Sequence, residues 1–307
     1  MLTILLATYN GEKYLQAQLD SLLSQTFTEF KVWVQDDAST DSTWDILTQY
    51  KQRHTNKFEI VKRKKNSGSA KENFLDMMAN VQDDYIMLCD QDDIWLPNKI
   101  ELTMAKMREL EQKFPDMPLL VHTDLQVVDK DLNVISLSFK ILTKRNYSRM
   151  EFRHVLTLNN VSGCTVLYNK ALARYLTVSP KDCVMHDWWL QLVAKAFGQI
   201  GHINDATLLY RQHGENACGA KDVSKFLYKL NRLLNGKELR KVLHETCDQA
   251  RCLLDIHHEK LTKQQQYILQ EYSSIPSMGK FRRIKTIFKL RTFMPSISRN
   301  IALLLFI

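Results

Sequence analysis

The alternation of short apolar runs with helix-like segments in the first 112 residues is the feature that most constrains the fold. Each apolar run has the length of one strand, and the segments between the runs carry apolar residues at helical spacing. The strand-like runs cover residues 2–7, 30–34, 58–61 and 85–88, and the helix-like segments cover residues 12–24, 42–50, 70–79 and 98–112. This order predicts an α/β fold with a mostly parallel central sheet and flanking helices.

Polar residues follow three of these runs, at the points where the predicted strands end. Because ligands of parallel sheets bind beyond the carboxyl ends of the strands, we expect the polar clusters to share one binding edge. The clusters are Thr8-Tyr9-Asn10, Asp36-Asp37 and residues 90–93. The sequence therefore predicts a single ligand site built from segments that are far apart in the chain.

The last of these clusters places three carboxylates, Asp90, Asp92 and Asp93, directly after a buried strand. Close like charges repel and resist burial unless a cation offsets them. The Asp-x-Asp spacing offers the hard oxygen ligands that Mg²⁺ and Mn²⁺ prefer, and such ions keep positions open for phosphate oxygens. We therefore expect a divalent metal and a diphosphate here, in preference to a solvated turn.

Other acidic and phosphate-binding motifs fit less well. A phosphatase with an aspartyl nucleophile would carry the motif on its first strand. A calcium loop could begin at Asp37, but Ser42 and Thr48 stand where it needs Gly and Glu. Neither a Gly-x-Gly-x-x-Gly nor a Walker A motif is present among the nine glycines. These absences argue against a dehydrogenase, a kinase or a sugar-nucleotide pyrophosphorylase.

Asp36 and Asp37 admit both a structural and a functional interpretation. They could cap the following helix, although Asp41 or Ser42 is better placed to do so. Their oxygens could also accept a hydrogen bond from a base N–H or a ribose hydroxyl. We expect both interpretations to apply, with the two acids closer to the sheet edge than the cap.

The middle of the chain mixes strands and helices and holds two further candidates. Strand-like runs cover residues 119–122, 125–128, 163–168 and 207–211. Asp187 opens a predicted helix, residues 187–197, either as a cap beside core tryptophans or as a general base, and the residues alone leave these two roles even. Arg211 and His213 precede a Gly-containing loop, residues 214–220, an arrangement that fits a lid closing on a diphosphate.

The basic residues concentrate in the C-terminal segment, residues 220–307. The whole chain has a formal net charge of +8, and no acidic residue follows Glu271. On a predicted helix, Phe281, Ile284, Ile287 and Phe288 share one side and Arg282, Lys285 and Lys289 another. A plain helical subdomain, a membrane-surface helix and a nucleic-acid contact remain open. We favour the membrane surface over nucleic acid because an apolar run, residues 301–307, ends the chain.

The six cysteines form no Cys-x-x-Cys pair, which argues against a zinc site and favours reduced thiols in a cytosolic protein. We also expect no secretory signal and no membrane span, because no apolar run approaches about 20 residues.

Taken together, the ordered motifs resemble one family. They are residues 6–11 (LATYNG), 35–39 (QDDAS), 90–97 (DQDDIWLP), 186–187 (HD) and 210–214 (YRQHG). The chain resembles the family-2 inverting glycosyltransferases with a Rossmann-like GT-A fold, and within them the bacterial rhamnosyltransferases of polysaccharide assembly. The resemblance covers residues 1–219 as a GT-A domain and leaves residues 220–307 as a basic helical extension.

The resemblance implies a role for each matching position. It makes Asp187 the catalytic base, Asp92 the main metal ligand, and Asp90 a neighbour of the ribose and the metal. His213 would meet the metal or the diphosphate, and His186 stands where family members often carry Glu. The implied donor-binding set is Thr8, Tyr9 (stacked on the base), Asn10, Asp36, Asp37 (on the base imide), Asn66, Lys71, Asp90 and Arg211. The implied sugar or acceptor side is Asp93, Trp95 and Trp188.

The expected activity is an inverting, Mg²⁺- or Mn²⁺-dependent sugar transfer. The expected donor is dTDP-rhamnose, with a UDP-hexose as the alternative, and the acceptor is a glycan or a polyprenyl-linked glycan. The expected location is cytoplasmic, at the inner face of a bacterial membrane, with no nucleic-acid partner. A nucleotide-sugar-binding protein or a membrane-associated scaffold without transferase activity is the alternative of another class.

Overall fold

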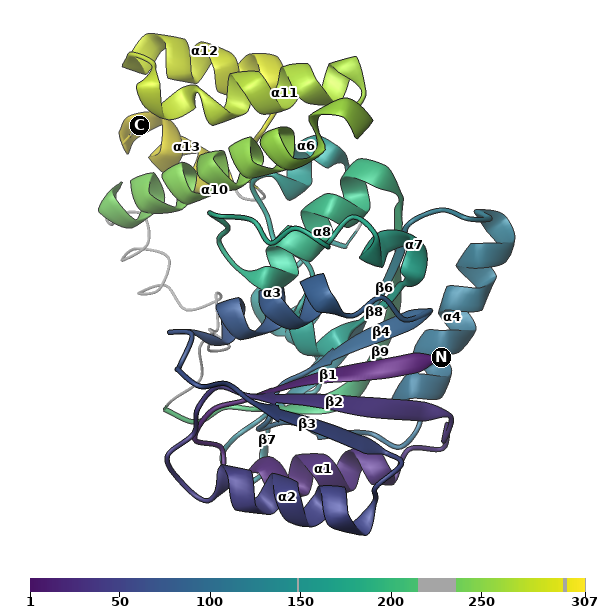
Figure 1. Cartoon of the computed structure of the whole chain (residues 1–307). Coiled ribbons are helices and arrows are strands. Elements are labelled where there is room, and N and C mark those ends of the chain that lie inside the picture. Colours follow the sequence, from purple (N-terminus) through teal and green to yellow (C-terminus); the bar gives the residue numbers. More distant parts are fainter. Residues whose placement is uncertain (148, 215–235, 295–296, 307) are drawn as a thin grey trace.

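The protein was analysed as a computed structural model that describes residues 1–147, 149–214, 236–294 and 297–306. A mixed sheet forms the centre of the molecule, in the strand order β3-β2-β1-β4-β8-β6-β9-β5, with β7 paired to β6 (Figure 1). The strands are β1 Leu2–Thr8, β2 Phe30–Asp36, β3 Phe58–Lys62, β4 Tyr85–Cys89, β5 Ile94–Trp95, β6 Leu119–Val128, β7 Val134–Ser136, β8 Val166–Asn169 and β9 Gln199–Arg211.

The first four strands are parallel to one another, as the alternating pattern predicted. β8 is antiparallel to both β4 and β6, and β6 is parallel to β9. The register aligns Thr8 with Asp36, and Leu6 with Cys89. The carboxyl ends of β1, β2 and β4, with the polar residues that follow them, therefore meet at one edge of the sheet.

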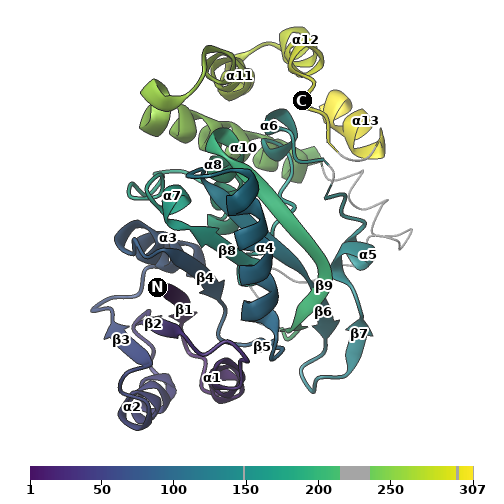
Figure 2. The ribbon, with the colours of Figure 1, turned by 90° about the vertical axis from the view of Figure 1, so that its right-hand side faces the viewer.

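Helices cover both faces of the sheet (Figures 1 and 2). One apolar cluster joins β1 and β2 to α1, α2 and α4, and a second joins the opposite face to α3, α7 and α8. The helices are α1 Leu15–Leu23, α2 Thr43–Arg53, α3 Ala70–Asn80, α4 Lys99–Lys113, α5 Phe139–Thr143, α6 Phe152–Val155, α7 Lys170–Ala173 and α8 His186–Phe197, with a 3₁₀ turn, η1, at Gly163–Thr165.

Several predicted element boundaries were wrong. The two strand-like runs after residue 118 form one strand, β6, whose pairing with β9 shifts register beside Asp124. Such a bulge interrupts the apolar alternation without ending the strand. β9 begins at Gln199 instead of residue 207, and η1 replaces the start of the strand predicted at residue 163. Ile94 and Trp95 form the short edge strand β5, which the sequence did not indicate.

The C-terminal helices pack on the face that carries α8 (Figure 1). They are α10 Gly236–His257, α11 Lys263–Ser273, α12 Lys280–Leu290 and α13 Ile297–Phe306, with 3₁₀ turns η2 His258–Lys260 and η3 Ile275–Ser277. Leu243 and Cys247 of α10 belong to the same buried cluster as Trp189 of α8. The Gln249 side chain accepts a hydrogen bond from Val184 N at 3.1 Å. The described C-terminal helices therefore share a core with the α/β part, and the expected boundary near residue 220 falls outside the described residues.

The outer face of α12 differs from the predicted pattern. Ile287 is 1% exposed, whereas Phe281 is 91% exposed and Phe288 is 54% exposed. The four apolar residues predicted on one side of this helix are therefore divided between the core and the surface, because burial follows the contact with α11 and not the helix alone. Among the described helices, none is long and apolar enough to cross a bilayer.

Candidate active site

The loop after β2 holds its two carboxylates through local hydrogen bonds. Asp37 is 2% exposed, and its two side-chain oxygens accept hydrogen bonds from Ser67 N at 2.8 Å and Ser67 Oγ at 2.7 Å. Asp36 is fully buried and accepts hydrogen bonds from Thr8 Oγ1 at 3.1 Å and Ser39 N at 3.1 Å. Both acids therefore also shape the backbone of this edge.

Two further residues predicted to bind the donor are Asn66, in the loop after β3, and Lys71, at the start of α3. Asn66 Nδ2 donates to Asp37 O at 3.1 Å. The Lys71 ammonium, in the first turn of α3, donates to Cys183 O at 3.1 Å and lies 3.3 Å from a Glu72 oxygen. Ser67, which links this loop to Asp37, was not identified from the sequence, although the Asn-Ser-Gly turn at residues 66–68 is a recognisable signal.

The loop after β1 is joined to the acidic loop by Gln91. Tyr9 N donates to Gln91 Oε1 at 2.9 Å, and Gln91 Nε2 donates to Tyr9 O at 2.9 Å. The Tyr9 side chain is 47% exposed, so its ring is free to pack on a ligand. Asn10 has a φ of 46° and accepts from Thr40 N at 2.9 Å. A Cβ at Gly11 would lie 2.2 Å from Gln91 Oε1, so a larger residue there would displace the Gln91 side chain that joins the two loops.

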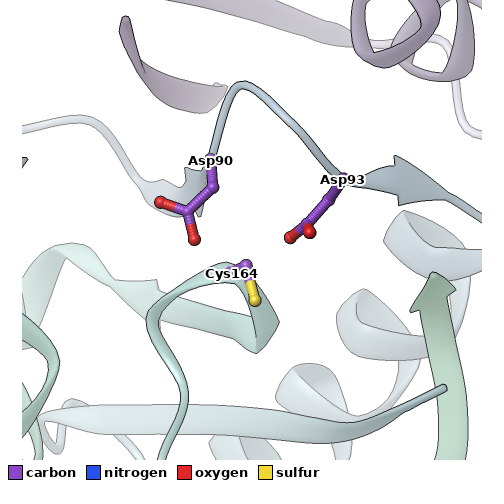
Figure 3. A group of neighbouring side chains, drawn as sticks. All are labelled: Asp90, Asp93 and Cys164. Atoms are coloured by element: carbon purple, nitrogen blue, oxygen red, sulfur yellow. The ribbon is translucent and has the colours of Figure 1, made fainter. Parts of the chain in front are cut away.

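The acidic loop places Asp90, Asp93 and Cys164 with their ligand atoms within 4.8 Å of one another (Figure 3). Burial, with the Asp92 and Asp187 carboxylates nearby, raises the pKa of Asp90 to about 7. Burial, with the Asp92 and Asp90 carboxylates nearby, raises the pKa of Asp93 well above its usual range. Burial also raises the pKa of the Cys164 thiol. Cys164 comes from η1 and was not identified from the sequence, because only the fold brings it here.

The donor atoms of this loop fit a divalent cation. Asp93 is fully buried, and its Oδ1 accepts from Arg211 N at 3.2 Å, but its Oδ2 has no hydrogen-bond partner within the described part of the chain. Crowded carboxylates with an unpaired buried oxygen are stabilised by a cation. Carboxylate oxygens are ligands for Mg²⁺ and Mn²⁺, whereas a thiol favours softer metals. The oxygens of Asp90 and Asp93 therefore fit the predicted metal better than the Cys164 thiol does, although Asp93 was predicted on the sugar or acceptor side.

The end of β9 lies against the acidic loop. His213 Nε2 lies 2.6 Å from Asp92 Oδ2, and the His213 ring packs on Tyr14 with centroids 4.9 Å apart. Arg211 is 6% exposed, and its side chain donates to Asp92 O and Lys130 O, each at 2.9 Å. The structure thus directs the Arg211 guanidinium at one backbone carbonyl of the acidic loop and one of the turn between β6 and β7, whereas the sequence suggested the diphosphate.

Asp187 lies in the first turn of α8 and faces the acidic loop through η1. Its carboxylate accepts hydrogen bonds from Asn159 Nδ2 at 2.9 Å and Gly163 N at 3.2 Å. The next residue after Gly163 is Cys164, which contacts Asp90 and Asp93. The backbone of η1 therefore connects the predicted base directly to the predicted metal site.

The tryptophans predicted on the sugar or acceptor side are buried. Trp95 is 1% exposed, within the apolar cluster that includes α1 and α4. Trp188 is 9% exposed and its indole N–H donates to Val155 O at 2.7 Å. His186 is also buried, with its ring stacked on Phe74 at 4.4 Å between centroids. These three rings support the helix and strand that carry the site, because aromatic side chains are drawn to the core by their large apolar surface.

Sequence comparisons find similar proteins over most of the chain. A family model described as Glycosyl transferase family 2 matches residues 3–176. The dTDP-rhamnosyl transferase RfbG of Shigella flexneri is 28% identical over 250 residues, which cover 77% of this chain and 81% of RfbG. The Escherichia coli UDP-Glc:alpha-D-GlcNAc-diphosphoundecaprenol beta-1,3-glucosyltransferase WfaP is 26% identical over 227 residues, which cover 74% of this chain and 81% of WfaP.

Solved structures share the fold at lower identity. Residues 1–349 of S. aureus TarS in complex with UDP-GlcNAc align with a TM-score of 0.58 and 19% identity, over 98% of this chain and 86% of TarS. The mannosyltransferase PcManGT from Pyrobaculum calidifontis in complex with GDP-Man and Mn²⁺ aligns with a TM-score of 0.51 and 14% identity, over 99% and 86% of the two chains. These alignments confirm the predicted fold class.

Proposed function

This chain belongs to glycosyl transferase family 2 and transfers a sugar from a nucleotide sugar, and from that premise we propose that it passes rhamnose from dTDP-rhamnose to a lipid-linked glycan with inversion. The donor is supported by the similarity to RfbG, a dTDP-rhamnosyl transferase. The lipid-linked acceptor is supported by the similarity to WfaP, whose acceptor is a diphosphoundecaprenol. A UDP-hexose donor is the second candidate. It is supported by WfaP, whose name gives UDP-Glc as the donor, and by TarS, whose structure contains UDP-GlcNAc.

The observation that carries the mechanism is the link between Asp187 and the acidic loop through η1. Gly163 N donates to Asp187, and the adjacent Cys164 contacts Asp90 and Asp93. A base beside the proposed diphosphate site would accept the proton of an acceptor hydroxyl that approaches the opposite face of the sugar. Asp187 takes the hydroxyl proton as the acceptor oxygen bonds to the anomeric carbon, and the nucleoside diphosphate leaves with the electrons of the broken bond.

The remaining residues hold the donor. Tyr9 offers an exposed ring for the base, and Asp37 accepts from the base N–H if Ser67 gives way. A Mg²⁺ or Mn²⁺ ion held by Asp90 and Asp92, with His213 beside Asp92, would offset the negative charge of the diphosphate. Arg211 joins this loop to the turn between β6 and β7 through its contacts with the Asp92 and Lys130 carbonyls.

A donor screen tests the proposal. The chain is mixed with dTDP-rhamnose or a UDP-hexose, with a polyprenyl-linked glycan, and with or without Mn²⁺, and release of nucleoside diphosphate is measured. Metal-dependent release from dTDP-rhamnose is the expected result. Release from a UDP-hexose alone would instead establish the second candidate, and binding of a sugar nucleotide without release would contradict both.

The proposed location of the protein follows from the lipid-linked acceptor, which is held in a membrane. We propose that residues 1–219 form the catalytic part and that the C-terminal helices hold it at the inner face of the membrane from the cytoplasmic side. Phe281, Lys285 and Phe288 lie one turn apart on the outer face of α12, and Phe281 is 91% exposed. Exposed aromatic rings among cations are typical of helices that lie on anionic membranes.

A further inference from the structure

A second apolar and basic surface lies on β7 and α5, outside the C-terminal helices. Four apolar side chains are exposed there within eight residues: Val134 is 56% exposed, Ile135 55%, Leu137 73% and Ile141 76%. We call these residues, with Lys140 and Lys144, the β7–α5 patch. Single exposed apolar residues are ordinary, but a contiguous group marks an interaction surface.

The charged residues in and around the patch, within residues 132–150, are all basic. Lys140, Lys144, Arg145 and Arg149 fall between Asp131 and Glu151, and no acidic residue lies between those two positions. Lys140 is held beside the apolar residues by the fold. Lys140 Nζ donates to Asn204 Oδ1 at 2.7 Å, and the Lys140 backbone N–H donates to Asp124. The patch therefore complements a surface that is apolar and anionic.

Hydrogen bonds connect the segment that follows the patch to the turn that holds Asp187. Arg145 NH1 donates to Ser162 Oγ at 3.4 Å, and Asn160 Nδ2 donates to Asn146 O at 3.1 Å. Ser162 directly precedes Gly163, whose N–H donates to Asp187. The segment that follows α5 is thus one hydrogen bond away from the turn that holds the base.

Part of the C-terminal region lies on the same side of the molecule as the elements that carry the patch. α13, α5 and β7 lie along one side of the molecule, at the right in Figure 2. On α13, Ile301 is 53% exposed and Leu305 is 63% exposed. Arg149 NH2 donates to Phe293 O at 3.4 Å, which joins the segment after α5 to the chain leading into α13.

We propose that the β7–α5 patch docks on an anionic bilayer, so that a lipid-linked acceptor enters the site from the membrane beside Asp187. The inference rests on the proposed function, since only an acceptor held in a membrane requires this contact. Leu137 and Ile141 enter the apolar layer, and Lys140 and Lys144 lie at the level of the lipid phosphates, as in other shallow membrane contacts. This contact is separate from that of α12.

Flotation of the full chain tests the docking. Vesicles of phosphatidylcholine are compared with vesicles that also contain phosphatidylglycerol, and binding only to the anionic vesicles is expected. The double change Leu137→Glu and Ile141→Glu is expected to weaken binding at least about tenfold, because burying one such side chain is worth about that factor in an equilibrium constant. Val178→Glu, at a residue that is 54% exposed beyond α7, is the matched control and keeps full binding.

A second variant separates the two membrane surfaces. Phe281→Glu with Phe288→Glu changes α12 and leaves the β7–α5 patch intact. If this variant loses flotation while the Leu137 and Ile141 variant floats like the unchanged chain, the proposal is overturned. A dimer of the unchanged chain that the Leu137 and Ile141 changes dissociate, without vesicle binding, would overturn it too, since the patch would then contact a second copy.

Turnover distinguishes failure of the docking from failure of the proposed function. With a polyprenyl-diphosphate-linked glycan in anionic vesicles, the Leu137 and Ile141 variant is expected to lose at least about tenfold in turnover. With the same glycan free of lipid, it keeps the turnover of the unchanged chain. Equal turnover on both acceptors contradicts the docking alone, whereas an unchanged chain that consumes no sugar nucleotide with either acceptor contradicts the function.

Discussion

His213 Nε2 lies 2.6 Å from Asp92 Oδ2, although 121 positions separate the two residues in the chain. The contact joins the end of β9 to the loop after β4, and Arg211 secures the same loop from two residues away. The acidic loop and the segment leading out of the sheet are therefore one structural unit. A change in either residue is expected to alter the response to metal.

Replacing His213 by Ala should raise the Mn²⁺ concentration needed for half-maximal activity by at least about tenfold, because partners of metal ligands orient them. The measurement is a Mn²⁺ titration of nucleoside diphosphate release. His244→Ala, on the exposed side of α10, is the control and should leave the titration unchanged. An unaltered Mn²⁺ response in the His213 variant would remove His213 from the metal site.

Replacing Asp187 by Asn should preserve donor binding and reduce transfer by about 10²–10⁴-fold or more, because the amide cannot accept the acceptor proton. Donor affinity is measured by calorimetry and transfer by product formation. Asp45→Asn, on the exposed side of α2, serves as the control. Turnover that survives the Asp187 change would end the assignment of this residue as the base.

Replacing Gly198 by Ala should lower the free energy of unfolding by about 1–3 kcal/mol. An added Cβ would lie 1.7 Å from the Pro118 carbonyl oxygen, and backbone cannot move aside as a flexible side chain can. Urea denaturation measures the difference. Gly279→Ala is the matched control, since nothing lies within 4 Å of a Cβ there, and its stability should stay close to that of the unchanged chain.

Stability should fall as the pH drops below the ordinary pKa of histidine, and His122 should account for part of the loss. Burial lowers the pKa of His122 to about 3. Between that value and 6.5, the unfolded chain binds a proton that the folded chain does not. The contribution of His122 is therefore complete above pH 6.5 and is lost as the pH falls, at up to about 1.4 kcal/mol per pH unit.

His122→Phe should remove this part of the pH dependence, since both ring nitrogens of His122 are buried without hydrogen-bond partners among the described residues. Urea denaturation at pH 7, 6 and 5 compares the variant with the unchanged chain. His244→Phe, at an exposed position, should retain the full dependence. If the free energy of unfolding changed with pH by the same amount in the His122 variant and the unchanged chain, His122 would not titrate as its burial implies.

Much of the fold could be predicted because its signals are local. The first four strands and the helices after them follow from apolar spacing, and their predicted ends differ from the structure by only a few residues. The middle of the chain was harder. The bulge beside Asp124 and the 3₁₀ turn at Gly163 interrupt the spacing of apolar residues, so one long strand resembled two and a turn resembled a strand.

The residues of the site also divide into those that the local sequence indicates and those that only the fold brings together. Asp90, Asp92 and Asp187 could be singled out because their residue types and neighbours indicate chemistry. Cys164 could not, since an isolated cysteine carries no signal until the fold places it beside a carboxylate. Ser67 was missed although it stands in a recognisable turn, because its contact with Asp37 depends on how two loops pack. Trp95 and Trp188 were placed on the ligand side, but the apolar surface of each ring is buried in the core.

By itself, the sequence determined the α/β order, the shared edge of the polar clusters and the crowding of carboxylates in the acidic loop. These follow from the period of apolar residues and from the parallel direction of the strands, both of which are properties of short segments. Only the tertiary structure decided which distant side chains meet: His213 with Asp92, Gln91 with Tyr9, and α10 with α8. Contacts of this kind depend on how whole elements pack, because the burial of a residue is set by its neighbours in space and not by its neighbours in the chain.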